Sequence, residues 1–238
     1  MENFVLVHGA WVSSLYWRHT AQALRKAGHE VYAPTLTGLG SRKHLLSPQI
    51  TLDTHIRDVL GVIDEQDLSD IVLVGHSYGG MVVTGVADAI PQKIASLVYL
   101  DAFIPQNGQA LVNIVPAGPG TVQAPAPVPG VEWLIPPPPP EAFGPPSAAV
   151  RDFAARKMSP HPLACFTQPL ALTGGVERIR RKTYIYCNDP QPTTLTPFYE
   201  KVRGRPDWTV HTLPCTHNAQ LDMPRELAAL LLQAASPA

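Results

Sequence analysis

The chain has 238 residues, of which 45% are hydrophobic and 16% are charged, and its formal net charge is −1. This length suits one domain with an insertion, and the hydrophobic fraction is enough for a sizeable core. The small net charge leaves no basic face for nucleic acid. No apolar run approaches the roughly 20 residues that cross a bilayer. We therefore expect neither nucleic acid nor a membrane as a partner.

The N-terminus begins directly with an apolar strand pattern at residues 4–7, without the basic segment of a secretion signal. The cysteines, Cys165, Cys187 and Cys215, are odd in number and lack C-x-x-C spacing. This pattern argues against a disulfide framework or a zinc site. We expect buried, inert thiols and a cytoplasmic location. The sequence leaves the oligomeric state open, a homodimer included.

Short apolar strands alternate with helical patterns along most of the chain. Strands are predicted at residues 3–7, 30–33, 70–74, 95–100, 182–187 and 208–213, and helices at 15–27, 51–65, 78–89 and 223–235. The last helix has Asp222 placed as its cap. Several strands are apolar throughout, as in a parallel sheet covered on both faces. The alternation predicts an α/β fold with a mostly parallel central sheet flanked by helices.

One stretch interrupts this pattern, because residues 105–170 hold 16 of the 26 prolines. A disordered linker and a proline-rich ligand for a partner domain are two interpretations. The apolar residues in the stretch, among them Trp133 and Phe143, favour an ordered lid over the carboxyl ends of the strands. We therefore predict a core formed by residues 1–104 and 182–238 and an inserted lid at 105–181, named here the proline-rich segment.

The most informative motif is Gly75-His76-Ser77-Tyr78-Gly79, which reads G-x-S-x-G between a predicted strand and a predicted helix. In such a turn a strained serine holds its hydroxyl above the sheet. The flanking glycines let the strand and the helix approach closely. This context predicts Ser77 as a nucleophile.

A nucleophilic serine needs a base, and His217 is the best placed of nine histidines. It follows the strand at 208–213 and precedes the last helix, so it lies at the same edge of the sheet as Ser77. The histidine in turn needs an acid. Asp101 and Asp189 both follow strands and fit the order Ser, acid, His. We favour Asp189, because its strand should neighbour the one that leads to His217.

The first strand ends in His8-Gly9-Ala10-Trp11. We predict that the backbone N–H groups of Ala10 and Tyr78 converge on a developing oxyanion. His8 is expected to brace this loop.

With these residues in place, the chain resembles the α/β-hydrolases, and within them the branch of plant methylesterases, plant hydroxynitrile lyases and small bacterial esterases. The matching stretches are 4–11, 24–33, 70–80, 94–105 and the His217 region, which frame about two-thirds of the chain. The resemblance implies a triad of Ser77, Asp189 and His217. The lyases share a threonine and a lysine where this chain has Gly9 and Asn218, which favours an esterase.

We expect hydrolysis of carboxylic esters of small, largely apolar substrates through an acyl-enzyme, with no cofactor and no metal. Gly9, Trp11 and Trp133 are predicted to contact the substrate. Two alternatives stay open on the same residues. One is lyase-like or perhydrolase chemistry, and the other is a small-ligand receptor with little turnover.

Overall fold

In the computed structural model, six parallel strands form one central sheet in the order β2–β1–β3–β4–β7–β8. The structure describes residues 1–115, 126–144, 147–189 and 193–236. Each of the six strands predicted from the sequence is present. Their bounds are β1 (Asn3–Val7), β2 (Glu30–Tyr32), β3 (Ile71–His76), β4 (Ile94–Leu100), β7 (Lys182–Cys187) and β8 (Trp208–Leu213).

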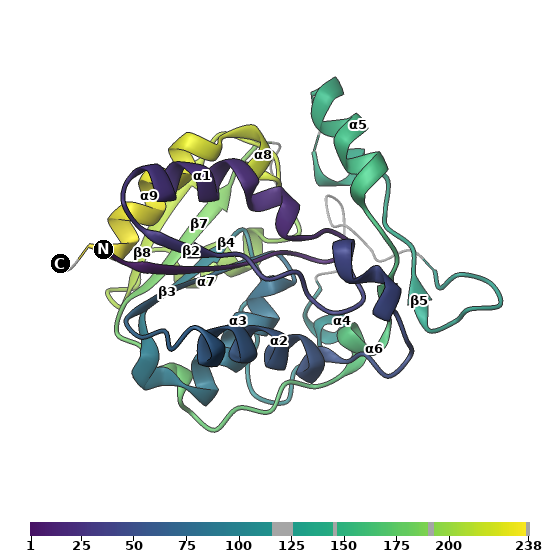
Figure 1. Ribbon diagram of the computed structural model, residues 1–238, viewed down its shortest axis with the longest axis horizontal. Coiled ribbons are helices and arrows are strands. Elements are labelled where there is room, and N and C mark those ends of the chain that lie inside the picture. The colour runs from purple at the N-terminus through teal and green to yellow at the C-terminus, as the bar shows by residue number, and fades with distance from the viewer. Residues whose placement is uncertain (116–125, 145–146, 190–192, 237–238) are drawn as a thin grey trace.

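Helices cover both faces of this sheet (Figure 1). One face carries α1 (Arg18–Lys26), α8 (Ala219–Asp222) and α9 (Pro224–Ala235), and the other carries α2 (Leu52–Glu65), α3 (Gly79–Ala89) and α7 (Thr196–Val202). Every residue of β3 is buried, because apolar side chains pack against it from both sides. The prediction of a parallel sheet between two helical layers is confirmed.

Some local features differ from the predictions. Residues 14–17 form a 3-10 turn (η1, Ser14–Trp17), so the helix expected at 15–27 starts only at Arg18. Asp222 does not cap α9, because its carboxylate accepts hydrogen bonds from the N–H and the hydroxyl of Thr216. These bonds tie α8 to the loop that carries His217. Within the described residues, none of the helices has the length and apolar character that a membrane crossing requires.

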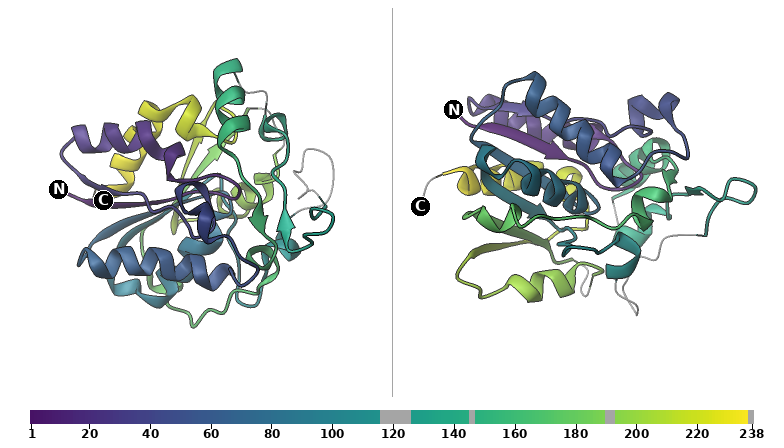
Figure 2. Two further views of the ribbon diagram at one scale, coloured as in Figure 1. Left: turned by 45° about the vertical axis from the view of Figure 1, so that its right-hand side comes forward. Right: turned by 90° about the horizontal axis from the view of Figure 1, so that it is seen from below.

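Much of the described part of the proline-rich segment, including α5, β5 and α6, lies beyond the carboxyl ends of the strands, opposite the N-terminus (Figures 1 and 2). Its last residues, 173–181, return past the end of α3 to the start of β7. Residues 116–125 and 145–146 of the expected lid lie outside the described residues. The segment contains a small antiparallel sheet of β5 and β6. Its elements are α4 (Leu111–Ile114), β5 (Leu134–Ile135), η4 (Pro140–Phe143), α5 (Ala148–Lys157), β6 (His161–Pro162), α6 (Ala164–Thr167) and η5 (Val176–Arg178). Two further 3-10 turns lie in the core, η2 (Gly40–Leu45) and η3 (Pro91–Lys93).

Candidate active site

The site lies where the strand order reverses, between β1 and β3. Open α/β sheets bind ligands at such a point, outside the carboxyl ends of the strands. The loop after β1 and the turn after β3 are in close contact there. A Cβ on Gly9 would lie 2.9 Å from Cβ of Ser77, so only glycine fits beside the serine without a shift.

Ser77 occupies the sharp turn between β3 and α3, with φ of 56°. This left-handed conformation costs a non-glycine residue roughly 1–3 kcal/mol and persists only where the surroundings enforce it. A Cβ on Gly75 would meet the side chain of Val83 at 2.5 Å, and one on Gly79 would meet the carbonyl oxygen of His8 at 2.9 Å. The strand–turn–helix geometry predicted from the motif is therefore present.

His217 is held at four points beside this turn. Its ring Nδ1–H donates to Oδ2 of Asp101 at 2.6 Å. Its backbone N–H donates to the carbonyl of Phe143 at 3.1 Å, and its own carbonyl accepts Nε2–H of His76 at 2.8 Å. The Phe143 ring stacks on the imidazole, with centroids 5.4 Å apart and planes 17° apart. The imidazole therefore has a fixed orientation, and within the described residues its Nε2 makes no hydrogen bond, to Ser77 or to any other group.

Asp101 follows β4 and is completely buried. Burial raises the pKa of its carboxyl, and the hydrogen bond from His217 partly offsets this rise. Its second oxygen, Oδ1, accepts the N–H of Cys187 at 3.3 Å. Each carboxylate oxygen therefore has a different donor, which fixes the orientation of the group.

The prediction of Asp189 as the partner of His217 is wrong. Asp189 is exposed, and its backbone N–H donates to the carbonyl of Cys215. The physical reason is the path of the loop after β8. Hydrogen bonds to His76 and to Phe143 draw His217 across the end of β7, so that its ring reaches the carboxylate at the end of β4.

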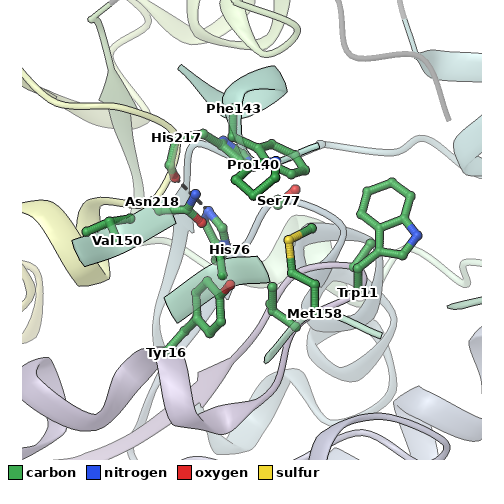
Figure 3. Close-up of a pocket in the computed structure, with 14 residues that line it drawn as sticks. Trp11, Tyr16, His76, Ser77, Pro140, Phe143, Val150, Met158, His217 and Asn218 are labelled. Atoms are coloured by element: carbon green, nitrogen blue, oxygen red, sulfur yellow. Dashed lines mark hydrogen bonds between the residues drawn. The ribbon is translucent and has the colours of Figure 1, made fainter. Parts of the chain in front are cut away.

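A pocket connects these residues (Figure 3), and its empty volume, including the open mouth, is about 410 Å³. Ser77 lies between Trp11 and Met158 on one side and His76 and His217 on the other. Most of the other side chains around it are apolar. The lining residues are Gly9, Ala10, Trp11, Val12, Tyr16, His76, Ser77, Pro140, Phe143, Val150, Ala154, Met158, His217 and Asn218.

Of the residues predicted to contact substrate, Gly9 and Trp11 line this pocket and Trp133 does not. The prediction for Trp133 rested only on an aromatic residue in the proline-rich segment, and this pocket does not support it. Trp133 is half-buried, and its carbonyl accepts the N–H of Leu163. The aromatic residue of the segment that does face the site is Phe143.

The backbone N–H groups of Ala10 and Tyr78 have no hydrogen-bond acceptor among the residues that the structure describes. Ala10 lines the pocket, and Tyr78 directly follows Ser77. His8 braces the first loop as expected, because its Nδ1–H donates to the carbonyl of Gly9 at 2.9 Å while Nε2 accepts the N–H of Leu36. That carbonyl belongs to the same peptide group as the Ala10 N–H, so His8 sets the direction of this donor.

Behind the loop lies a buried cluster of His55, His161 and Cys165, whose ligand atoms lie within 4.8 Å of one another. Two of its members are poorly suited to bind a metal ion. Nδ1 of His161 accepts the N–H of Trp11, so the neutral ring carries its proton on Nε2, where a metal would need a lone pair. Burial also raises the pKa of the Cys165 thiol to about 12, which disfavours the thiolate. The hydrogen bonds of the cluster therefore fit a neutral polar core better than a metal centre.

Two residues that hold the site had no recognisable signal in the sequence. His76 lies inside the G-x-S-x-G motif, yet nothing in the motif predicts its hydrogen bond to His217, 141 residues away. Phe143 lies among prolines, and its stacking on His217 depends on how the proline-rich segment folds back.

Residues 4–230 match the model of the alpha/beta hydrolase family. A carbendazim hydrolyzing esterase from Nocardioides sp. (strain SG-4G) is 47% identical, over 97% of this chain and 98% of its own length. Methylesterase 7 of Arabidopsis thaliana is 33% identical over 44% of this chain and 41% of its own. An extracellular alpha/beta-hydrolase from a Paenibacillus species superimposes with a TM-score of 0.81 at 26% identity, covering 98% of this chain and 99% of the other.

The chain therefore belongs to the alpha/beta hydrolase family. The resemblance to the branch of plant methylesterases and bacterial esterases, inferred from the motifs, is confirmed by these relatives.

Proposed function

We propose that this protein is a serine esterase that hydrolyses carboxylic esters of small, largely apolar substrates. Ser77 is the nucleophile, His217 the general base, and Asp101 the acid that orients the histidine. One observation carries the assignment: a buried carboxylate holds Nδ1–H of a histidine that lines the same pocket as a serine in a strained turn.

The hydrogen bond to Asp101 keeps the proton of His217 on Nδ1 and leaves the lone pair on Nε2. Nε2 takes the proton of Ser77 as the hydroxyl oxygen attacks the ester carbonyl. The imidazolium that forms is stabilised by the Asp101 carboxylate. It then protonates the leaving alcohol. In the second half of the reaction Nε2 takes a proton from water as the water oxygen attacks the acyl carbonyl, and it gives this proton to the oxygen of Ser77 as the acid is released.

The N–H groups of Ala10 and Tyr78 are proposed to bind the oxyanion of the tetrahedral intermediate. Their lack of other acceptors among the described residues supports this role. Donors fixed before the reaction need no reorganisation, and removal of one such donor typically costs about 10²–10³ in kcat.

The apolar lining supports apolar substrates, since Trp11, Val150 and Met158 surround the serine. We propose that the proline-rich segment acts as a lid that supplies part of this lining. Its contributions are Pro140, Phe143, Val150, Ala154 and Met158. Hydrolysis of carbendazim by a relative that is 47% identical makes this compound one substrate to test.

The test is a panel of short p-nitrophenyl esters, with carbendazim included, run on the wild type and on Ser77→Ala. We expect Ser77→Ala to lose hydrolysis by several orders of magnitude, because the members of a triad act as a unit. Wild-type activity in Ser77→Ala would refute the assignment. A fluorophosphonate probe should label the wild type and not the variant.

A further inference from the structure

Trp11, which directly follows the oxyanion donor Ala10, has a strained backbone. Its φ is 63°, in the left-handed region that bulky side chains rarely adopt. Such a conformation persists only where neighbouring groups enforce it. The residues that enforce it come from the proline-rich segment rather than from the sheet.

Three hydrogen bonds from that segment hold Trp11. Its N–H donates to Nδ1 of His161 at 3.2 Å, and its carbonyl accepts the N–H of Ser159 at 2.9 Å. Its indole N–H donates to the carbonyl of Ile135 at 3.2 Å. Ile135 and His161 are paired residues of β5 and β6, so this small sheet holds Trp11 as one unit.

The position of His161 is itself rigid. Pro160 and Pro162 flank it. A proline fixes its own φ and restricts the residue before it to extended backbone, which matches the strand conformation of β6. The ring is fully buried, and it stacks on Phe166 with centroids 4.6 Å apart.

The protonation of His161 is also fixed. Burial, together with the nearby rings of His55 and His8, keeps its pKa well below the usual range, so the ring is neutral. The ring of Tyr78 lies edge-on to it, with centroids 5.0 Å apart, and Sγ of Cys165 lies within 4.8 Å of one of its ring nitrogens. Since Nδ1 accepts a hydrogen bond, the proton lies on Nε2, which has no partner among the described residues. An unpartnered buried N–H lowers the stability of the folded protein. This cost at Nε2 points to a role for Nδ1, the acceptor on the other side of the ring.

We propose that His161 is a positioning residue for the oxyanion loop: its Nδ1 holds the peptide group after Ala10, as His8 holds the peptide group before it. The peptide groups on both sides of Ala10 are then fixed, one from the core and one from the proline-rich segment. The oxyanion site is complete only when β5 and β6 are in place. This inference rests on the proposed serine esterase reaction.

The test compares His161→Asn with His161→Leu, two side chains of nearly equal shape. The asparagine Oδ1 lies near the position of Nδ1 and can accept the Trp11 N–H, whereas leucine cannot. We expect His161→Leu to lose about 10²-fold in kcat with little change in KM, as for a catalytic group displaced by about 1 Å. His161→Asn should stay within about tenfold of the wild type. His211→Asn, a half-buried histidine on the edge strand β8, is the matched control and should leave kcat unchanged.

A second measurement reads the loop directly. In protein labelled with ¹⁵N-tryptophan, the backbone amide signal of Trp11 should keep its position in His161→Asn and move in His161→Leu. Equal kcat values for the two variants, or an unmoved Trp11 signal in His161→Leu, would overturn the proposal. If His161→Leu does not fold, His161→Gln replaces it, because its amide lies near the Nε2 position and leaves the Trp11 N–H without an acceptor.

A failure of the proposed esterase function would give a different experimental result. If Ser77→Ala hydrolyses the ester as fast as the wild type, the esterase assignment fails. The Trp11 signal then decides the positioning claim alone, and an unmoved signal in His161→Leu overturns it.

Discussion

Replacement of Asp101 by asparagine should reverse the tautomer of His217. The N–H of Cys187 donates to Oδ1 of Asp101, so the asparagine amide keeps its oxygen on that side. Its NH₂ group then faces Nδ1 of His217, where the carboxylate accepted a proton before. Nδ1 must become the acceptor, and the imidazole proton moves to Nε2, which faces the pocket of Ser77. A histidine in this tautomer cannot take the serine proton.

The expected loss is about 10⁴-fold in kcat, or about 5.5 kcal/mol in the barrier, by analogy with asparagine in serine-protease triads. The assay is p-nitrophenyl acetate hydrolysis at pH 7.5, with circular dichroism to verify folding. Asp189→Asn is the matched control, because Asp189 is exposed, and it should stay within about threefold of the wild type. A folded Asp101→Asn enzyme with less than about tenfold loss, or an equal loss in Asp189→Asn, would refute the tautomer argument.

Two further predictions concern packing and pH. Gly9→Ala should lower kcat about 10²-fold, because the new Cβ would lie 2.9 Å from Cβ of Ser77. Gly61→Ala is the control and should leave kcat unchanged, because its Cβ would meet nothing within 4 Å. Equal kcat values for the two variants would contradict the crowding argument. Burial lowers the pKa of His8 and of His55 to about 4, so the unfolded chain binds more protons below pH 6.5 and stability falls as the pH drops from 6.5 toward 4. These two histidines should contribute about 4 kcal/mol to the stability lost between pH 7 and pH 5. Urea unfolding should show a loss at least this large, about 2 kcal/mol smaller in His55→Gln and unchanged in the exposed-site variant His19→Asn. A flat free energy of unfolding over this range would disprove the prediction.

The fold was predictable because each strand carries its own signal. The strands are short apolar runs separated by helical patterns, and a strand buried on both faces needs no distant partner to be recognised. Helix α7 was missed because it starts at Thr196 with Pro197 in its first turn and has only 7 residues, too few for a clear helical period. The local sequence therefore predicted whether a segment is a helix or a strand better than it predicted the residues at which the element begins and ends.

The site was predictable as far as chain topology determines it. Ser77 and His217 follow parallel strands, so both had to lie at one edge of the sheet. The acid was not determined in this way, since Asp101 and Asp189 follow the adjacent strands β4 and β7. The choice between them depends on two hydrogen bonds of the His217 backbone, whose N–H donates to the carbonyl of Phe143 and whose carbonyl accepts Nε2–H of His76. No spacing in the sequence reveals these bonds.

Neutral histidines, rather than charged groups, make many of the hydrogen bonds that hold the loops of the site. The four that are buried are His8, His55, His76 and His161. Each neutral imidazole offers one donor and one acceptor on a rigid ring. His8 links two backbone segments in this way, and His55 links the carbonyl of Thr37 to the hydroxyl of Tyr78. A protonated ring loses its acceptor, so the bonds that Nε2 of His8 and Nδ1 of His161 accept from backbone N–H groups require the neutral form that burial favours. The burial that keeps His8 and His161 neutral therefore also keeps the two peptide groups of Ala10 in place, and acid should weaken this loop. The bond that holds the carbonyl of His217 should persist, because His76 makes it with a donor, Nε2–H.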